Sequence, residues 1–250
     1  LFAAFLRAPI GHGVITGINI SEAAAAPGVT SVYVGDDLKT AGVGPIPNVT
    51  PFVNRDGSDM SRTQRPAVAL GKIYHVGEII AMVVADSTAL AQDAVDLIDL
   101  DVDPLPALVD VTKAQDADAP QLHEHIPNNV CLDFQIGDEA KASAAIDSAA
   151  HVVNLTLTTN RLVVASMEPR SAAARFLASA NDGAGCYELI SGSQGVNAMR
   201  NMLADVIFQV PHEQMRVMTN DVGGGFGMKT QAYPEYVAIL FASKMTGKPV

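Results

Sequence analysis

Residues 215–229 read Met-Arg-Val-Met-Thr-Asn-Asp-Val-Gly-Gly-Gly-Phe-Gly-Met-Lys, a short apolar strand followed by a glycine-rich loop. Four of the five residues from Gly223 to Gly227 are glycine. Glycine accepts positive φ angles and lets the backbone approach a ligand closely. Successive N–H groups in such a loop can surround an anion. The stretch therefore predicts an anion-binding junction after a strand, and a simple tight turn is an alternative of equal weight.

The loop does not match the common nucleotide-binding motifs. A GxGxxG fingerprint would need glycine at position 228, which is methionine. A P-loop would need a Gly-Lys pair directly before Thr230, and the residue before Lys229 is methionine. The sequence thus excludes both motifs at this position.

Helices are predicted on both sides of the loop. Gln194–Ile207 places Val196, Met199, Leu203 and Val206 on one face. Downstream, Pro234 suits a first helical turn, and Glu235–Met245 is almost entirely apolar. We expect this second helix to lack a covering sheet, which would leave an exposed apolar face that aggregates or binds partners.

Strands are predicted upstream of the first helix. Ala172–Ala178 and Tyr187–Ile190 bracket a hairpin-like Asn181-Asp182-Gly183. An alanine-rich helix runs from Gly137-Asp138 to about Ala150. His151–Thr159 alternates apolar and polar residues, as a half-buried strand does.

The N-terminal half mixes strands and short helices. Proline-rich residues 41–66 are expected to form a loop. A helix capped at Asp86 or Ser87 has Leu90, Ala94 and Leu97 on one face, and a brief helix begins at Ser21. The predicted strands or apolar runs are Val14–Ile20, Ser31–Val34, Ile73–Val76, Ile79–Val84 and Leu97–Val102.

The elements together predict an α+β chain of two domains. Residues 110–130 are acidic and polar, with little periodicity, which is typical of an interdomain linker. We therefore predict a first domain over 1–112, a linker over 113–130 and a second domain over 131–250.

Composition excludes several classes of protein. The formal net charge is −11 and the basic residues are scattered singly, which argues against a nucleic-acid-binding surface. No apolar run approaches the ~18–20 residues of a membrane span. Cys131 and Cys186 are the only cysteines, too few for a disulfide framework or an iron–sulfur cluster.

The two ends of the sequence suggest a piece of a longer chain. The first residue is Leu1, and Leu1–Leu6 does not have the pattern of a signal peptide, which favours a cytoplasmic location. At the other end, Gly247 and Pro249 are residues that stop a helix, and Val250 would open a following strand. We expect a fragment cut at both ends.

Two polar segments are further candidates. Ser193-Gln194-Gly195 lies between a strand and a helix, so Ser193 can cap the helix and the Gln194 amide can meet an oxyanion there; a plain cap is the simpler interpretation. In Met167-Glu168-Pro169-Arg170, the default expectation is an exposed ion pair between Glu168 and Arg170.

Metal and hydrolase sites are not predicted. His123-Glu124-His125 has metal-binding residue types, but two histidines two residues apart on a loop fix no coordination geometry, so a solvated loop is favoured. No histidine pairs with a nucleophile, and neither cysteine has a basic neighbour that would lower its pKa. Serine or cysteine hydrolase chemistry is therefore not indicated.

Taken in order, these segments resemble a known family. The chain resembles the large, molybdenum-binding subunit of the xanthine dehydrogenase and aldehyde oxidase family, most closely its aerobic carbon-monoxide-dehydrogenase-like branch. The N-terminal matches are Leu6-Arg7-Ala8-Pro9 with His12, Gly71–Glu78 and Asp103–Asp110. The later matches are Asn160-Arg161-Leu162, Met167–Arg170, Ser193–Gly195 and Asp221–Gly227.

The resemblance implies a fold, an activity and a cofactor. The fold would be an N-terminal α/β hammerhead domain followed by the first, incomplete part of a molybdopterin-binding α+β domain. The family hydroxylates an aldehyde, an N-heterocycle or CO with oxygen from water. The cofactor would be molybdopterin with molybdenum, in its cytosine dinucleotide form in bacterial relatives.

The resemblance also implies roles for individual residues. Gln194 would hydrogen-bond an oxo ligand of molybdenum without binding the metal, and no residue here would be a direct metal ligand. The catalytic base glutamate would lie beyond Val250, so the chain alone would hold no catalytic residue and be inactive. The residues beside the cofactor would be Gly195, Gly224, Gly225, Phe226 and Gly227.

Partners and departures follow from the same resemblance. Electrons would pass to an iron–sulfur small subunit and an FAD-binding medium subunit, and export together with a partner is an alternative to the cytoplasm. Thr230 stands where purine-oxidising relatives have a glutamate, which argues against xanthine as the substrate. Neither cysteine lies in a position that matches the copper-binding loop of carbon monoxide dehydrogenases.

Two other functions remain open at this point. The chain could be a non-catalytic binding or assembly module that retains only the subunit-docking surface. It could also be an unrelated α+β protein whose glycine loop binds a phosphate.

Overall fold

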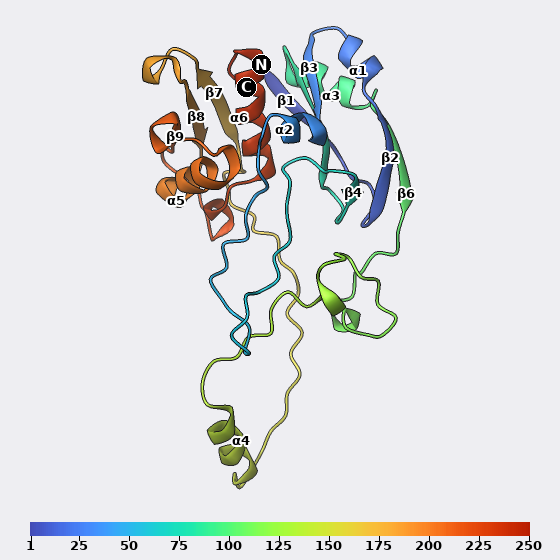
Figure 1. Ribbon diagram of the computed structural model, residues 1–250, viewed down its shortest axis with the longest axis vertical. Helices are drawn as coiled ribbons and strands as arrows, with labels where there is room; N and C mark the ends of the chain where they lie inside the picture. The colour runs from blue at the N-terminus through green and yellow to red at the C-terminus, as the bar shows by residue number, and fades with distance from the viewer.

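The computed structural model describes all 250 residues, which form two packed units and a narrow projection (Figure 1). The first unit contains two three-stranded antiparallel sheets. One sheet has the order β1 (Phe2–Arg7), β5 (Ile79–Ala85), β3 (Val29–Val34), and the other β4 (Lys72–Ile73), β2 (Gly13–Asn19), β6 (Asp99–Pro104). The helices of this unit are α1 (Ser21–Ala25), α2 (Gly35–Thr40) and α3 (Thr88–Val95).

Strand β5 is the centre of the first unit because it is buried on both faces. Ala81, Val83 and Ala85 pack in a cluster with residues of α1 and α3. Met82 and Val84 face the opposite way, into the largest core of the molecule. A strand covered on both sides is apolar throughout rather than alternating, which explains the continuous run in the sequence.

The predicted helices at Ser21 and Ser87 and the strands within Val14–Ile20, Ser31–Val34 and Ile79–Val84 are confirmed. The run Ile73–Val76 is strand only at Ile73, the run at Leu97–Val102 becomes strand only from Asp99, and β1 and α2 were not predicted. The Ser87 side chain accepts a hydrogen bond of 3.2 Å from the Leu90 N–H, so Ser87 caps α3 as expected. Leu97 is not on the buried face, since α3 ends at Val95 and Leu97 is 42% exposed. Residues 41–66 contain no helix or strand, only isolated bridges, as predicted.

The second unit is a three-stranded sheet with one crossover. β7 (Ala172–Leu177) and β8 (Cys186–Ser191) form an antiparallel hairpin around the turn at Asn181–Gly183, where Asn181 and Asp182 both have φ of 53°. β9 (Met215–Met218) runs parallel to β8. These three predicted strands and the turn are confirmed.

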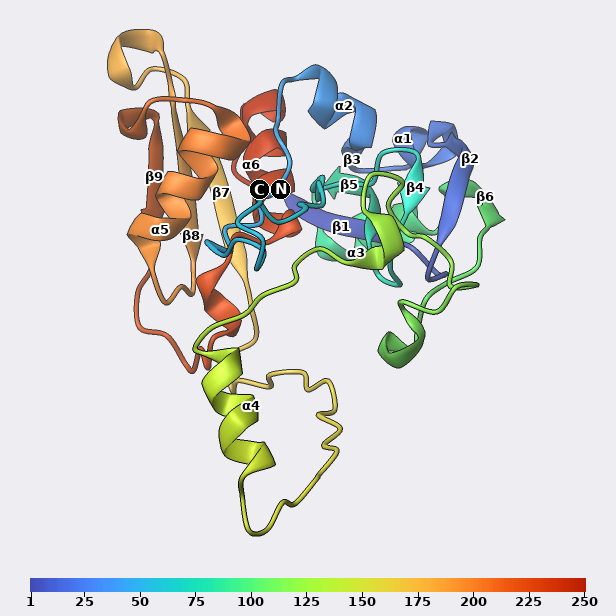
Figure 2. The same ribbon diagram turned by 60° about the horizontal axis from the view of Figure 1, so that its bottom comes forward.

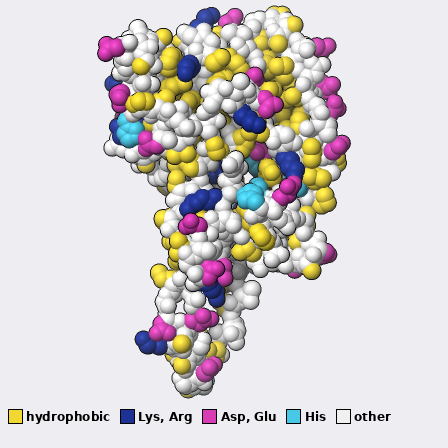
Figure 3. Space-filling model, in the orientation of Figure 1, with side chains coloured by type: hydrophobic (Ala, Val, Ile, Leu, Met, Phe, Trp, Pro, Cys, Tyr) yellow, Lys and Arg dark blue, Asp and Glu magenta, His cyan; other side chains and the backbone are white.

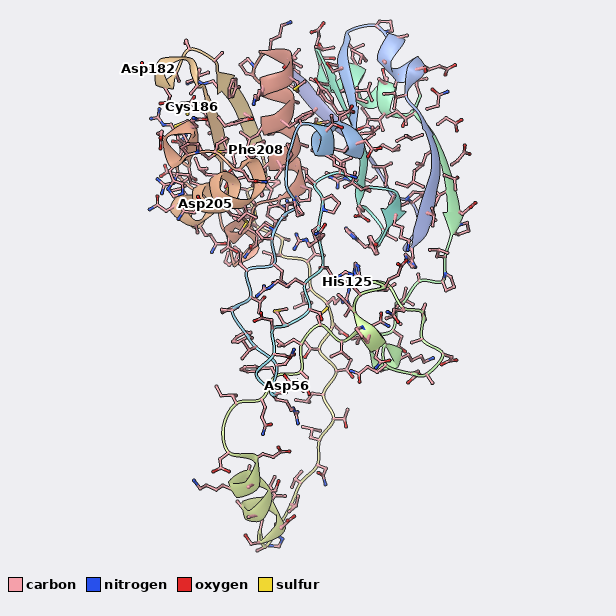
Figure 4. The ribbon with its side chains drawn as sticks, in the orientation of Figure 1. Asp56, His125, Asp182, Cys186, Asp205 and Phe208 are labelled. Carbon is pink, nitrogen blue, oxygen red and sulfur yellow. The ribbon has the colours of Figure 1, made fainter.

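The crossover between β8 and β9 departs from the predicted regular helix. α5 (Val196–Asn201) continues into a π-helical segment, η4 (Met202–Phe208), on which Figure 4 labels Asp205 and Phe208. Leu203 and Ile207 are fully buried, whereas Val206 is 41% exposed. A π-turn holds an extra residue, so the buried face moves on by one position and the assignment of Val206 to it is wrong.

Helix α6 (Pro234–Thr246) joins the two units. Pro234 opens it, Gly247 ends it with φ of 64°, and every residue from Tyr236 to Ser243 is buried. The helix lies between β7 and β8 on one side and β5 on the other (Figures 1 and 2). The expectation that it lacks a covering sheet is therefore wrong, because the first unit supplies the second covering face.

The chain termini also lie at this junction (Figure 1). The Leu1 amino group donates a hydrogen bond of 2.8 Å to the Pro249 carbonyl. Val250 exchanges two backbone hydrogen bonds of 2.8 Å with Ala174, so it pairs with the edge of β7 as a strand residue, as predicted.

Residues 131–170 form most of the projection, with α4 (Glu139–Asp147) at its far end (Figure 2). The predicted helix is confirmed, and the Asp138 carboxylate caps it by accepting a 3.0 Å hydrogen bond from the Lys141 N–H. In the space-filling view, apolar and charged side chains are mixed over this projection (Figure 3).

The predicted strand at His151–Thr159 does not form. Residues 151–165 make no backbone hydrogen bond to any other segment. Val153, Leu155 and Leu157 are 89%, 77% and 78% exposed. A strand needs a neighbour to satisfy its N–H and C=O groups, and no other part of this chain lies beside this segment.

Residues 113–130 pack against the first unit. The Ile126 side chain is 1% exposed. His123 stacks on Tyr74 with ring centroids 4.4 Å apart. Two short 3₁₀ turns, η1 (Val111–Lys113) and η2 (Pro127–Asn129), lie at the ends of the segment. The domain limits at 112 and 130 stay a prediction. None of the helices combines the length and the apolar character that crossing a bilayer requires.

Candidate functional site

The sheet of the second unit brings three sequence-distant segments to one edge. β8 and β9 are parallel, so the residues that follow them, from Gly192 and from Thr219, emerge at the same edge. β7 is antiparallel to β8 with Ala172 opposite Ser191, so the segment that precedes β7 begins at that edge too. Glu168, Gln194 and the Gly223–Gly227 loop therefore meet there, and their hydrogen bonds confirm the contact.

The glycines of the loop are required by close packing. A Cβ on Gly223 would lie 2.6 Å from the Glu168 Cβ, and one on Gly225 would lie 2.5 Å from the Gln194 Oε1. Gly224 has φ of 99° and Gly227 has φ of 84°. A Cβ on Gly227 would instead meet open space. The loop is thus closed on one side by Glu168 and Gln194 and open at its far end.

The Gln194 side chain is oriented by the loop. Its Oε1 accepts hydrogen bonds from the N–H groups of Gly227 (2.9 Å) and Lys229 (3.2 Å), and the Gln194 N–H donates to the Lys229 carbonyl at 3.0 Å. Because the oxygen is occupied twice, the exposed amide group offers its Nε2 hydrogens outward. Gln194 precedes the helix, which begins at Val196, so the predicted start two residues earlier is wrong.

Ser193 and Gly195 form the short link between β8 and α5. The Ser193 hydroxyl accepts a 3.1 Å hydrogen bond from the Gly195 N–H, but Gly195 is the N-cap of α5 and no side chain caps that helix, so the predicted cap at Ser193 is wrong. Gly195 has φ of −170°, an extended conformation open to any residue. This link fixes the direction in which Gln194 leaves the sheet.

Two N–H groups at the centre of the loop are free. Neither Gly225 nor Phe226 donates a backbone hydrogen bond within the chain. Phe226 has φ of 50°, and its side chain is 76% exposed. A bulky residue in the left-handed region is strained by about 1–3 kcal/mol, and such strain is concentrated at functional sites.

Glu168 is bound to the loop rather than to its neighbour in sequence. Its Oε2 accepts from the Lys229 Nζ at 2.6 Å and from the Gly223 N–H at 2.8 Å. The Lys229 ammonium, and then the Gly223 N–H, hold the pKa of Glu168 below its ordinary value. The expected Glu168–Arg170 pair is wrong, since the Arg170 guanidinium stacks over the Tyr233 ring at 3.6 Å.

Lys229 is the site residue that sequence reasoning missed. Its side chain is fully buried and its Nζ lies between Glu168 and the backbone beside Gly192. A lysine after a glycine-rich loop is ordinarily solvated. Only the fold, which places Met167–Arg170 beside the loop, shows that Lys229 pairs with the Glu168 carboxylate.

The side chains of His123, Glu124 and His125 contact other residues instead of converging on a common point. His123 stacks on Tyr74, Glu124 pairs with Lys72 at 3.2 Å, and the His125 Nε2 lies 3.2 Å from the Arg62 carbonyl oxygen. Figure 4 labels His125 among the loops, away from the sheet of the second unit. No three His, Cys, Asp or Glu side chains of the structure gather in a metal-binding arrangement.

Two hollows lie near these elements. One of about 380 Å³ borders the site and is lined in part by Glu168, Gly192 and Asp221. A larger one of about 460 Å³ lies between the two units, where Arg7 forms a 2.7 Å ion pair with Glu235. The smaller hollow lies beside Glu168 and the start of the segment that leads into the glycine loop, and neither hollow is lined by Gln194 or by Gly223–Gly227.

Beside the Asp221 carboxylate, which lines the neighbouring hollow, the site leaves a set of hydrogen-bond donors free. They are the N–H groups of Gly225 and Phe226 and the Nε2 hydrogens of Gln194. N–H donors of this kind bind the anionic or oxo oxygens of a ligand. The residues present therefore fit a bound group that is rich in anionic oxygens.

Comparison with known families agrees with this chemistry. The model of the aldehyde oxidase and xanthine dehydrogenase a/b hammerhead domain matches residues 1–106. The model of the molybdopterin cofactor-binding domain matches residues 122–250, just over half of the chain. The chain belongs to the xanthine dehydrogenase and aldehyde oxidase family of molybdopterin-binding large subunits.

Individual relatives support the assignment. The carbon monoxide dehydrogenase large chain of Afipia carboxidovorans is 30% identical over the whole of this chain, which spans 30% of its length. Aldehyde oxidoreductase of Megalodesulfovibrio gigas is 31% identical, and this chain spans 26% of it. The crystal structure of quinoline 2-oxidoreductase from Pseudomonas putida 86 superposes with a TM-score of 0.87 at 30% identity, over 99% of this chain and 30% of that one.

The predicted family and fold are thereby confirmed. The α+β fold is a hammerhead domain followed by part of a molybdopterin-binding domain, and the likeness to carbon monoxide dehydrogenase holds. The chain spans about 30% of the relatives' length. The assignment of individual residues to the cofactor stays a prediction.

Proposed function

We propose that this chain forms the hammerhead and glycine-loop portion of a molybdenum hydroxylase large subunit. The whole enzyme would oxidise an aldehyde, an N-heterocycle or CO, with water as the oxygen source. The observation that carries the proposal is the set of free donors at one sheet edge, offered by Gly225, Phe226 and Gln194. When bound, the molybdenum–pterin cofactor supplies the two-electron redox chemistry.

Each site residue has a distinct part in holding that cofactor. Gln194, oriented by the loop, donates from Nε2 to an oxo oxygen of the cofactor. Gly225 and Phe226 donate from their N–H groups to anionic oxygens. Gly195, Gly224 and Gly227 carry no side chain, so the backbone can come close to the bound group. The exposed ring of Phe226 would be covered on binding and would exclude water from these donors.

The site also limits the substrate. The Thr230 hydroxyl donates to the Gly227 carbonyl at 2.9 Å, so this position offers no charged group. Purine-oxidising relatives carry a glutamate there, and we therefore disfavour xanthine. Relatives named for CO, an aldehyde and quinoline support the three remaining substrate classes.

Electron transfer would use other subunits. We place an iron–sulfur centre in a small subunit and FAD in a medium subunit, which agrees with a relative named as one subunit of a dehydrogenase complex. The pterin would carry a cytosine nucleotide, and the assembly would reside in the cytoplasm. Glu168 is held by Lys229 and Gly223 through its Oε2, so we assign it to the loop rather than to catalysis and place the catalytic base outside residues 1–250.

That engaged carboxylate also favours a second candidate function. A chain without a free base could serve as a non-catalytic module that docks partner subunits. The two functions differ in whether the loop holds a pterin.

The test is the cofactor content of the polypeptide. The chain is purified from a molybdate-replete host that makes molybdopterin, bound pterin is measured by fluorescence after oxidation, and molybdenum by mass spectrometry. We expect both in the wild type and neither in Gln194→Ala with Gly225→Val. Wild-type protein without pterin would contradict cofactor binding, and co-purification of iron–sulfur and flavin subunits would then favour the docking module.

A further inference from the structure

A fully buried ammonium group lies beneath the candidate site. The Lys229 side chain has no exposed surface, although lysine is almost never buried without a partner. Its Nζ donates to the Glu168 carbonyl at 3.0 Å and to the Glu168 Oε2 at 2.6 Å. A buried charge is costly unless it is paired and hydrogen-bonded, so Lys229 holds Glu168 in one position.

Glu168 in turn fastens the beginning of the glycine loop. Its Oε2 accepts from the Gly223 N–H at 2.8 Å, and its own N–H donates to the Gly223 carbonyl at 3.1 Å. These two bonds and the contact between the Glu168 Cβ and the Gly223 backbone leave the first glycine little freedom.

Lys229 belongs to the other end of the same loop. Its N–H donates to the Gln194 Oε1 at 3.2 Å, and its carbonyl accepts from the Gln194 N–H at 3.0 Å. The Glu168–Lys229 ion pair therefore joins the start of the loop to its end. Between these fixed ends lie Gly225 and Phe226, whose N–H groups are free.

Gly192 lies directly beside this ion pair. A Cβ there would lie 3.4 Å from both the Lys229 Nζ and the Glu168 Oε2. Gly192 follows β8 directly, so the pair sits at the sheet edge from which the loop emerges.

We propose that Lys229 is a positioning residue that, through Glu168, ties the two ends of the glycine loop together and keeps the Gly225 and Phe226 N–H groups free and directed outward. The inference deepens the proposed function by naming what pre-forms the cofactor-binding loop. The loop conformation can be measured in the protein without cofactor, so the two proposals can fail separately.

The experiment is residue-resolved amide exchange on the chain without cofactor. Lys229→Met removes the ammonium but keeps the length of the side chain. We expect the Gly223 and Gly227 amides to exchange about tenfold faster, the effect of losing one hydrogen bond, while the amides of Val83 and Val84 in β5 stay as in the wild type. Lys244→Met, an exposed lysine of the same unit with no carboxylate partner, is the matched control and should change none of them.

A second variant covers the case in which Lys229→Met does not fold. Glu168→Gln keeps the shape of the side chain and an acceptor oxygen for the Lys229 ammonium, so it should speed exchange at Gly223 and Gly227 by a smaller factor. Equal acceleration at Val83 and Val84, or no change in the loop amides in either variant, would overturn the proposal.

A pH titration separates positioning from a general contribution to stability. The amide chemical shift of Gly223 should follow the protonation of Glu168 in the wild type. In Lys229→Met the midpoint should rise toward the ordinary value for glutamate. An unchanged midpoint would show that Lys229 does not act through Glu168. None of these readouts requires pterin, so a wild-type chain without pterin would contradict only the proposed function.

Discussion

The side-chain amide of Gln194 lies so close to Gly225 that a Cβ on Gly225 would fall 2.5 Å from the Gln194 Oε1. The glycine and the amide are therefore a matched pair. The same oxygen accepts the N–H groups of Gly227 and Lys229, so any displacement of the amide also releases the end of the loop.

Gly225→Ala is expected to reduce cofactor retention without unfolding the protein. The added methyl group displaces the Gln194 amide and misdirects its Nε2 donor. Losing one hydrogen bond to an anionic group corresponds to about a 10- to 100-fold weaker binding. The measurement is pterin content per polypeptide after dialysis, together with thermal melting.

Gly42→Ala is the control for this substitution. Gly42 has φ of 77° and open space around it, so alanine there introduces backbone strain of about 1–2 kcal/mol far from the loop. It should lower the melting temperature and leave pterin content unchanged. Equal pterin loss in both variants would show that stability alone controls retention.

Glu168 should make stability depend on pH in the acid range. Its pKa is lowered in the folded state, by the Lys229 ammonium first and the Gly223 N–H second. A lowered pKa means that the stabilisation is complete above the ordinary value of 4.5 and is lost as pH falls from there through the lower folded-state pKa. Urea unfolding of wild type and Glu168→Gln should therefore show a difference near pH 7 that shrinks as the pH falls below 4.5. A constant difference would exclude titration of Glu168 as its source.

Much of the fold could be predicted because buried positions are occupied by apolar residues, whose spacing in the sequence indicates a helix or a strand. The run at β5, the alternating pattern of β6 and the apolar helix α6 each point to one element. The glycine loop was predicted for a local reason, since positive φ and close packing both call for glycine. Its partner Gln194 was found only by position between a strand and a helix.

What could not be predicted depends on contacts between distant segments. Lys229 is solvated by default, and only the antiparallel placement of β7 beside β8 brings Glu168 to it. The cover of α6 comes from the first unit, which its own sequence cannot show. Residues 151–159 have the alternating pattern of a strand, but a strand forms only when a second segment pairs with it. No other segment of this structure makes backbone hydrogen bonds to these residues.

The buried carboxylate Glu188 gives a test of charge pairing in the second unit. Glu188 on β8 is 2% exposed and forms ion pairs with Arg175 of β7 and Arg216 of β9. The Arg216 Nη1 lies 3.2 Å from the Glu188 Oε1. The double variant Arg175→Met with Arg216→Met leaves the buried charge unpaired, which should cost about 3–5 kcal/mol.

Glu188→Leu should cost much less than that double variant. It removes the buried charge and leaves two arginines that are 52% and 64% exposed and can be solvated. Replacing a buried charge with an apolar group of similar volume is often near neutral. Urea unfolding of the three proteins measures the order, and a Glu188→Leu loss as large as that of the double variant would contradict it.

The two cysteines should differ sharply in reactivity. Cys186, labelled in Figure 4, lies on β8 and is buried. Burial first, then the neighbouring Glu188 carboxylate, raises the pKa of its thiol. Since the thiolate is the reactive form, Cys186 should react at least about 100-fold more slowly with a disulfide reagent near pH 7.5 than the partly exposed Cys131. The rates are measured on Cys131→Ser and Cys186→Ser, each of which retains one thiol.

In denaturant the two rates should become equal, because both causes of the raised pKa are properties of the folded sheet. Rapid labelling of Cys186 in the folded protein would mean that β8 opens to solvent, and the hydrogen-bonded register that brings Gln194 beside the glycine loop would then be less rigid than the site requires.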